Sequence, residues 1–100
     1  MNSNRKGKMY EREIAKYLRD HGYDARRGQQ YHGGADSPDV IGLPGFHIEA
    51  KRTESFRLYD ALRQSQRDAA ENEVPIVIHR RNDEPSVVIM FLDDFMEVIR

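Results

Sequence analysis

Apolar residues recur at helical spacing in two parts of the chain. The first stripe lies near the N-terminus and consists of Tyr10, Ile14, Tyr17, Leu18 and His21. It predicts an amphipathic helix over residues 9–21, which Gly22 would end because glycine readily takes the left-handed conformation found after helices. A second stripe, which includes Leu58 and Leu62, predicts a helix over residues 55–71.

Short apolar runs between turn-forming residues predict five strands. Their sequences are "YDARR", "DVIGL", "FHIEAK", "VPIVIH" and "SVVIMFL", at residues 23–27, 39–43, 46–51, 74–79 and 86–92. Pro44 and Gly45 form the turn between the second and third strands, and residues 28–38 form a loop by composition. Asp94 would cap a short final helix, with Glu97 at its third position. The order α-β-β-β-α-β-β with a short C-terminal helix indicates the α/β class, with a mixed central sheet flanked by helices.

The composition favours a small, highly charged protein with a single domain over residues 1–100. Charged residues make up 33% of the chain and apolar residues 38%, so we expect a small core and a homodimer that adds stability. The absence of cysteine excludes disulfides and thiolate zinc sites. No apolar run approaches the length of a membrane span, and residues 1–8 look like a mobile basic arm rather than a signal peptide. We therefore expect a cytoplasmic protein without a membrane partner.

Charge is distributed unevenly along the chain, although the net charge is only -1. Residues 1–30 carry eight Lys or Arg and four acids, and residues 51–67 carry five bases and two acids. Residues 31–50 between them carry three acids and no Lys or Arg, and residues 68–100 carry eight acids and three bases. Basic surface around an acidic centre suits a metal-dependent enzyme that acts on a polyanion, although segregation of solvated charges would give the same pattern.

The predicted hairpin over residues 39–51 carries charged groups that a buried strand pair normally avoids. Alternation along a strand places Glu49 and Lys51 on one face together with His47, and the turn brings Asp39 towards them. Two carboxylates and a main-chain carbonyl suit octahedral Mg²⁺, and a neighbouring lysine can orient or deprotonate a water molecule. The alternative is a solvated surface hairpin that contains a salt bridge.

Three stretches of the chain resemble known nucleases. "SPDVIG" followed by "HIEAK" resembles the signature of the PD-(D/E)xK nuclease superfamily, in which Asp stands on one strand and Glu-x-Lys on the next. "RKGKMYEREIAKYLRDHGYDARR" resembles the opening of the small archaeal and phage Holliday junction resolvases, and "EVPIVIHRRNDEPSVVIMFLDDF" resembles the closing strands of small phage and prophage nucleases of the same superfamily. The resemblance implies the restriction-endonuclease-like fold and a Mg²⁺-dependent endodeoxyribonuclease, for which Mn²⁺ can substitute.

The resemblance also implies a set of site residues. Glu11, Asp39, Glu49 and the main-chain carbonyl of Ala50 would bind the metal, and Lys51 would be the catalytic lysine. The three carboxylates and Lys51 together would catalyse hydrolysis of a phosphodiester.

Two assignments remain open from the residues alone. Helical periodicity does not choose between Glu11 and Glu13, whereas the resemblance chooses Glu11. A glutamine on the helix after the Glu-x-Lys motif joins the site in some members of the superfamily, and the spacing favours Gln64 as a catalytic residue. The amphipathic stripe instead places Gln66 nearer the buried side.

DNA, branched or duplex, is the expected partner of a homodimer with two sites. The residues expected to bind backbone phosphates are Arg5, Lys6, Lys8, Arg26, Arg27 and Arg52. Four other residues are weaker candidates for a role in the site. His32 could contact a metal or a phosphate, and Asp36 is an alternative metal ligand to Asp39. Tyr31 and Tyr59 could stack on bases, although packing is their favoured role. The preferred activity is that of a Holliday junction resolvase in a bacterium, an archaeon or a phage-infected host. The alternatives are a phage nicking or end-processing nuclease on duplex DNA, a non-catalytic DNA-binding module and a protein-interaction domain.

Overall fold

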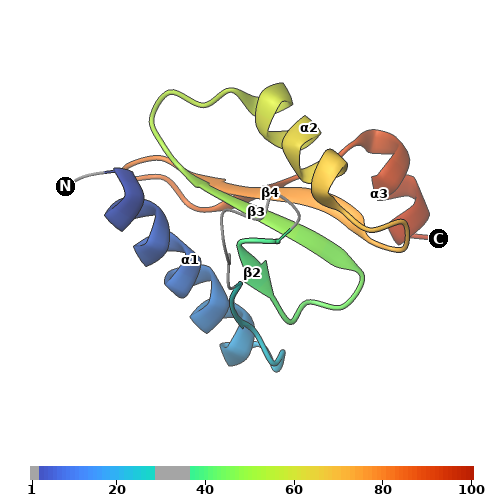
Figure 1. The fold of residues 1–100 in the computed structure, drawn as a ribbon, viewed down its shortest axis with the longest axis horizontal. Helices are drawn as coiled ribbons and strands as arrows, with labels where there is room; N and C mark the ends of the chain where they lie inside the picture. The colour runs from blue at the N-terminus through green and yellow to red at the C-terminus, as the bar shows by residue number, and fades with distance from the viewer. Residues whose placement is uncertain (1–2, 29–36) are drawn as a thin grey trace.

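A single mixed sheet with helices on both faces makes up the part of the chain that the computed structural model describes, residues 3–28 and 37–100 (Figure 1). Its elements are α1 (Ser3–Asp20), β1 (Arg26–Arg27), β2 (Val40–Ile41), β3 (Phe46–Arg52), α2 (Leu58–Asp68), β4 (Val74–Arg80), β5 (Val87–Ile89) and α3 (Leu92–Val98). The strands lie in the order β1-β2-β3-β4-β5. Strands β3 and β4 pair in parallel and the other neighbours are antiparallel. The predicted element order and the mixed α/β class are confirmed, and the arrangement is compatible with the restriction-endonuclease-like fold.

Helix α1 begins earlier than the sequence pattern indicated. Residues 3–8 are its first turns, so the expected mobile arm is wrong for these residues. Arginine and lysine are good helix formers, and Gly7 costs the helix only about 1 kcal/mol. The helix ends where expected, with Gly22 in the left-handed region at φ 95° and Tyr23 N donating to Leu18 O at 3.1 Å.

The apolar stripe of α1 is narrower than predicted. Tyr10 and Ile14 are buried against the sheet, and Ala15 joins them. Tyr17 and His21 are exposed and pack their rings on each other at 4.3 Å, so their assignment to the buried stripe is wrong. A helix that packs on a small sheet buries only the side chains that point directly at the sheet, and the side chains on either side of this stripe remain in water.

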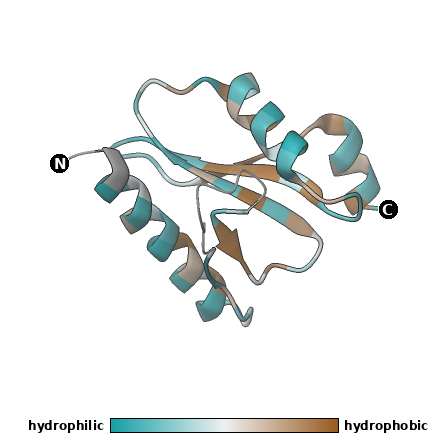
Figure 2. Ribbon diagram, viewed as in Figure 1, coloured by the Kyte–Doolittle hydropathy of each residue, from teal (hydrophilic) through white to brown (hydrophobic). Residues whose placement is uncertain are grey.

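The two faces of the sheet carry different cores. The face under α1 holds the larger one, with Val40, Ile48, Ile76 and Ile78 packed against Tyr10 and the residues around it. The face under α2 holds a smaller cluster in which Ala61 and Leu62 contact Val77. Figure 2 shows mostly hydrophobic residues along β2 and β4, alternating hydrophilic and hydrophobic residues along β3, and mostly hydrophilic residues along α1 and α2.

Several element ends differ from the predicted ones because tertiary contacts decide them. Strands β1 and β2 contain two residues each, and α2 covers residues 58–68 instead of 55–71. Strand β5 ends at Ile89, and Leu92, the last residue of the predicted strand, begins α3. Phe91 is the N-cap of α3 and makes no side-chain cap bond, so the predicted capping role of Asp94 is wrong. Asp94 instead lies in the first turn, where its negative charge interacts favourably with the helix dipole.

Within the described residues, no helix combines the length and the apolar character needed to span a membrane.

Candidate active site

Asp39 and Glu49 are brought together where β2 pairs with β3. Val40 is the partner of Ile48 in this antiparallel pair, and Asp39 N donates to Ile48 O at 2.9 Å. The Asp39 carboxylate also accepts the N–H of Ala50 through Oδ2 at 2.8 Å. Both carboxylates are buried, Asp39 with 8% and Glu49 with 3% exposure. The predicted approach of the two acids is therefore confirmed, and the alternative of a solvated surface hairpin is wrong.

The main chain next to Asp39 passes very close to β1. Gly28 N donates to Asp39 O at 2.9 Å, and a side chain at position 28 would collide with the carbonyl oxygen of Pro38. Glycine at this position therefore allows the strand end of β1 to hold the backbone that carries Asp39. Residues 29–36, including Tyr31, His32 and Asp36, lie outside the described residues.

The surroundings of Asp39 change the acidity of its carboxyl group. Burial raises the pKa of Asp39, and so do the negative charge of Glu49, a side-chain hydrogen bond with Glu49 and the charge of Glu11. The Ala50 N–H acts in the opposite direction, and the pKa of Asp39 comes to about 7. The site therefore favours a positive charge, a proton or a cation, between the two carboxylates.

Glu11 adds a third carboxylate from α1. Its Oε1 accepts from Arg27 Nε at 2.9 Å, and its charge acts on Asp39. Glu13 points elsewhere, to the guanidinium of Arg80 at 3.4 Å, and is half exposed. The structure thus brings Glu11, and not Glu13, to the acidic pair.

Lys51 follows Glu49 on the same face of β3 and meets α2. Its Nζ donates to Gln64 Oε1 at 3.5 Å in a partly buried contact. Gln66 is exposed and accepts from Arg63 at 2.9 Å. The structure therefore places Gln64 beside Lys51. The prediction that Gln66 lies nearer the buried side, which was made from the amphipathic stripe, is wrong.

His47 lies on the other side of Glu49 along β3 and is 1% exposed. Its Nε2 is 3.2 Å from Glu49 Oε1, and its Nδ1 is 3.7 Å from Glu73 Oε1. Burial lowers the pKa of His47. The hydrogen bond to Glu49 and the charges of Glu49, Glu73 and Asp68 together raise the pKa by more, so the net shift is upward. Strand alternation already put His47 on this face, whereas no sequence signal linked it to Asp68 at the end of α2 or to Glu73 in the following turn.

Comparison with known families identifies the chain at this point. The model of the family described as archaeal Holliday junction resolvase (Hjc) matches residues 2–67. The chain belongs to this family. The Hjc family lies within the PD-(D/E)xK-like nuclease superfamily, which confirms the resemblance read from the sequence. A search of curated proteins found no match to this chain.

The Hjc match covers the acidic pair and the elements that surround it. It runs from α1 to the end of α2 and so includes Glu11, Asp39, Glu49, Lys51 and Gln64. Strands β4 and β5 and helix α3 lie beyond the matched residues, although β4 completes the core under the site.

The basic residues that are expected to bind DNA differ in whether they are exposed or bound within the protein. Arg5, Lys8 and Arg26 are exposed, and Lys6 is partly exposed on α1. Arg27 binds Glu11, as described above.

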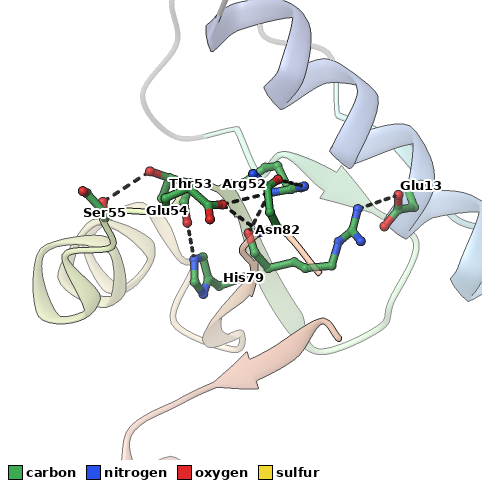
Figure 3. A network of polar contacts seen from close by, with 8 residues as sticks. Glu13, Arg52, Thr53, Glu54, Ser55, His79 and Asn82 are labelled. Atoms are coloured by element: carbon green, nitrogen blue, oxygen red, sulfur yellow. Dashed lines mark hydrogen bonds and ion pairs between the residues drawn. The ribbon is translucent and has the colours of Figure 1, made fainter. Parts of the chain in front are cut away.

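The guanidinium of Arg52 is bound within the protein by three hydrogen bonds. It donates to Asn82 Oδ1 at 2.6 Å, to Glu54 Oε2 at 3.4 Å and to the carbonyl of Arg80 at 3.5 Å (Figure 3). The same group of contacts joins His79 to the carbonyl of Thr53 at 2.9 Å. This network ties the end of β3 to the end of β4, so Arg52 has a structural role that its charge alone did not reveal.

The donors around Asp39 suit a hard divalent cation. Asp39 and Glu49 are in side-chain contact, the charge of Glu11 acts on Asp39, and the Asp39 side chain binds the main chain of Ala50. These are oxygen ligands, which Mg²⁺ and Mn²⁺ prefer. Burial and the negative charges of Glu49 and Glu11 raise the pKa of Asp39, and a bound cation would relieve both effects by neutralising the charge.

Proposed function

We propose that this chain is a metal-dependent endodeoxyribonuclease that cuts branched DNA of the Holliday junction type. The observation that carries the proposal is the buried pair Asp39 and Glu49, joined by Glu11 and flanked by Lys51. Membership in the Hjc family supports the nuclease class and DNA as the substrate. Mg²⁺ is the proposed cofactor, with Mn²⁺ as a substitute, because Asp39 and Glu49 offer buried carboxylate oxygens, which these ions prefer.

Each residue has a distinct task in the proposed hydrolysis. Asp39, Glu49, Glu11 and the Ala50 carbonyl would hold Mg²⁺, which supplies charge neutralisation at the phosphate and a more acidic water. Lys51, held by Gln64, orients the attacking water and stabilises the negative charge that develops on the phosphate oxygens. The attacking water would lose a proton to solvent as its oxygen bonds to phosphorus, and the bond from phosphorus to the 3′ oxygen would break, with the 3′ oxygen taking up a proton from solvent.

The exposed basic residues of α1 and β1 are proposed to bind backbone phosphates. Arg5, Lys8 and Arg26 are exposed, and α1 also carries Glu11, so DNA bound along these residues would reach the acidic site. Replacement of Lys8 by Ala should weaken DNA binding uniformly across sequences and reduce the slope of log affinity against log salt by about one. Lys16→Ala is the matched control, because Lys16 is exposed on the same helix but paired with Asp20 at 2.9 Å.

A second copy of this chain is proposed to cover the surface formed by β5 and α3. Both elements expose large apolar side chains: Val87, Val88, Leu92, Phe95, Met96 and Val98, followed by Ile99 directly after α3. Helix α3 buries none of its residues, and Leu92 is 72% exposed. A soluble chain rarely leaves so many neighbouring apolar side chains in water. A two-fold dimer would also provide two sites for paired incisions, as junction resolution requires.

Sedimentation measurements test the dimer directly. We expect the wild type to sediment as a dimer and the double variant Leu92→Asp/Phe95→Asp as a monomer with unchanged helix content. Tyr59→Asp, which alters an equally exposed side chain on α2, should leave the dimer intact. A monomeric wild type at micromolar concentration would contradict the proposed interface.

An incision assay tests the proposed activity. Labelled four-way junction, matched duplex and single strand are incubated with Mg²⁺ or EDTA and with wild type, Glu49→Gln or Lys51→Ala. We expect Mg²⁺-dependent cutting, fastest on the junction, and a loss of at least about 100-fold in both variants. Glu71→Gln and Lys16→Ala, which change exposed groups away from the site, should cut normally.

The outcomes separate the proposed function from its rivals. Mg²⁺-dependent cutting of duplex in preference to the junction would favour a nicking or end-processing nuclease. DNA binding without any cutting, and equal in wild type and variants, would leave only a binding module.

A further inference from the structure

His47 is a buried, hydrogen-bonding side chain to which the proposed hydrolysis assigns no task. It lies between β3 and α2 with 1% of its surface exposed, and Nε2 is 3.2 Å from Oε1 of Glu49. A metal-binding carboxylate can only accept, so with Glu49 as a metal ligand the hydrogen of this contact belongs to His47 Nε2, which donates to Glu49. The imidazole thus touches one oxygen of a carboxylate that the proposed function assigns to metal binding.

Acidic groups hold the other side of the imidazole. Nδ1 is 3.7 Å from Oε1 of Glu73, and the same oxygen accepts the N–H of Ala70 at 2.8 Å. Asp68, at the end of α2, places a carboxylate oxygen within 4.8 Å of both His47 and Glu49. The ring is therefore enclosed by carboxylates from the strand, the helix and the turn that follows the helix.

The main chain of His47 is equally well fixed. The hydroxyl of Ser65, which is fully buried on α2, lies 3.1 Å from the carbonyl oxygens of both His47 and Ile76. This contact joins α2 to two adjacent strands at the position of the histidine. The imidazole has a defined backbone beneath it and acids around it, so its orientation is set by the fold.

We propose that His47 is a positioning residue for Glu49, an inference that rests on the proposed metal-dependent function. Glu49 has three rotatable side-chain bonds and no hydrogen-bond donor of its own. The bond from His47 holds Oε1 and leaves Oε2, the other carboxylate oxygen, for a cation shared with Asp39. Partners that orient a metal-binding carboxylate in this way typically change metal affinity by about 10- to 100-fold when they are lost.

Direct coordination by His47 is the competing arrangement. His47, Glu49 and Asp68 offer ligand atoms close enough together for one ion. Two observations favour the positioning role. Nε2 already lies at hydrogen-bond distance from Glu49, and along β3 the histidine and Lys51 stand on opposite sides of Glu49. A cation held among His47, Glu49 and Asp68 would therefore lie away from the lysine that orients the water.

Titration with Mn²⁺ alone, followed by electron paramagnetic resonance of the free ion, tests the proposal. The variants are His47→Leu, which removes the donor, and His47→Gln, which restores an N–H donor. His79→Leu is the matched control, because this partly buried histidine on β4 contacts the carbonyl of Thr53 and the ring of Phe56 but no carboxylate. Circular dichroism and thermal unfolding in EDTA establish that each variant is folded.

We expect His47→Leu to weaken Mn²⁺ binding about tenfold or more and His47→Gln to bind within about threefold of wild type. His79→Leu should bind Mn²⁺ as the wild type does, whatever it does to stability. Unchanged Mn²⁺ affinity in a folded His47→Leu protein would overturn the positioning role. If that variant does not fold, a loss of affinity in folded His47→Gln equal to that in Glu49→Gln overturns it instead.

Two further results keep the inference separate from the function on which it rests. Pulsed resonance of wild-type protein with Mn²⁺ should show no directly coordinated nitrogen, and coupling from an imidazole ligand would overturn the positioning role in favour of coordination. Wild-type Mn²⁺ binding that Glu49→Gln leaves unchanged would overturn the proposed metal site itself. Binding that depends on Glu49 but not on His47 overturns only the inference.

Discussion

The two faces of β3 differ in what they bury, although the same seven residues form both. Phe46, Ile48 and Ala50 face α1 and join the larger apolar core. His47, Glu49 and Lys51 face α2 and place charged or hydrogen-bonding groups in an interior that also holds Asp39. The α1 face stabilises the fold through burial of apolar surface, whereas the α2 face keeps like charges close together at a cost in stability.

This difference separates stability from chemistry within one strand. Substitutions on the α1 face should lower the free energy of unfolding, and substitutions on the α2 face should alter metal binding or incision. The predictions below test that separation, first through stability and then through incision and pH dependence.

Ile48→Ala should cause the largest loss of stability. Ile48 is fully buried at the centre of the α1 face, so truncation leaves a cavity and should lower the free energy of unfolding by about 3 kcal/mol. Urea unfolding measures the change. Tyr17→Ala, on the exposed flank of α1, should cost less than about 0.5 kcal/mol. Equal losses in the two variants would contradict the proposed division between the faces.

Ser65→Ala should cause a smaller loss of stability on the α2 face. The buried hydroxyl lies within hydrogen-bond distance of two strand carbonyls, and its removal should lower the free energy of unfolding by about 1 kcal/mol. Ser55→Ala is the control, because residue 55 is exposed in the turn before α2. A Ser65→Ala protein as stable as wild type would show that the hydroxyl does not hold α2 to the sheet.

Gln64→Ala should affect incision rather than stability. Without the Gln64 oxygen, Lys51 loses the partner that orients it, and the rate of cutting should fall about tenfold, which corresponds to about 1.4 kcal/mol. Gln66→Ala, two residues further along the same helix and exposed, should cut like wild type. The reverse result would assign the site to Gln66 and contradict the position of the lysine contact.

The stability of the metal-free protein should depend on pH through Asp39. Its folded pKa of about 7 is higher than its value in an unfolded chain, so the folded state binds the proton more tightly. The resulting stabilisation is complete below about pH 4 and is lost as the pH rises through about 7. Asp39 faces Glu49 from β3 and Glu11 from α1, whose charges both favour the proton. His47, with its raised pKa, acts in the same direction.

Asp39→Asn isolates this contribution, because Asn keeps an oxygen for the Ala50 N–H and carries no charge. In EDTA, thermal unfolding of the wild type relative to Asp39→Asn should shift downward between pH 5 and pH 8. Addition of Mg²⁺ at pH 8 should reverse the shift in the wild type and have no effect on the variant. A pH-independent difference would mean that burial and the neighbouring charges do not raise the pKa of Asp39 in the folded protein.

Local patterns predicted the pairing of Asp39 with Glu49 because the interactions that create it are short in sequence. Strand alternation, the Pro44-Gly45 turn and the positive φ of 85° at Gly45 bring the two strands together without help from distant residues. The same alternation placed His47 and Lys51 on the face of Glu49. The partners of these residues come from α2 and from the turn after it. Spacing favoured Gln64 while the amphipathic stripe favoured Gln66, and no spacing rule in the sequence connects Glu73 to β3.

The sequence by itself determined the order of the elements, the Hjc-like motif and the two faces of β3, because periodicity and turn chemistry act over a few residues. Periodicity left Glu11 or Glu13 and Gln64 or Gln66 open, although the family resemblance chose Glu11 and spacing favoured Gln64. The tertiary structure shows the charge of Glu11 acting on Asp39 and Gln64 in contact with Lys51, and it alone decided that Arg52 is bound internally. It also decided that α3 leaves its apolar side chains exposed. These outcomes depend on how each helix is rotated against the sheet, and that rotation is set by packing between residues far apart in the chain.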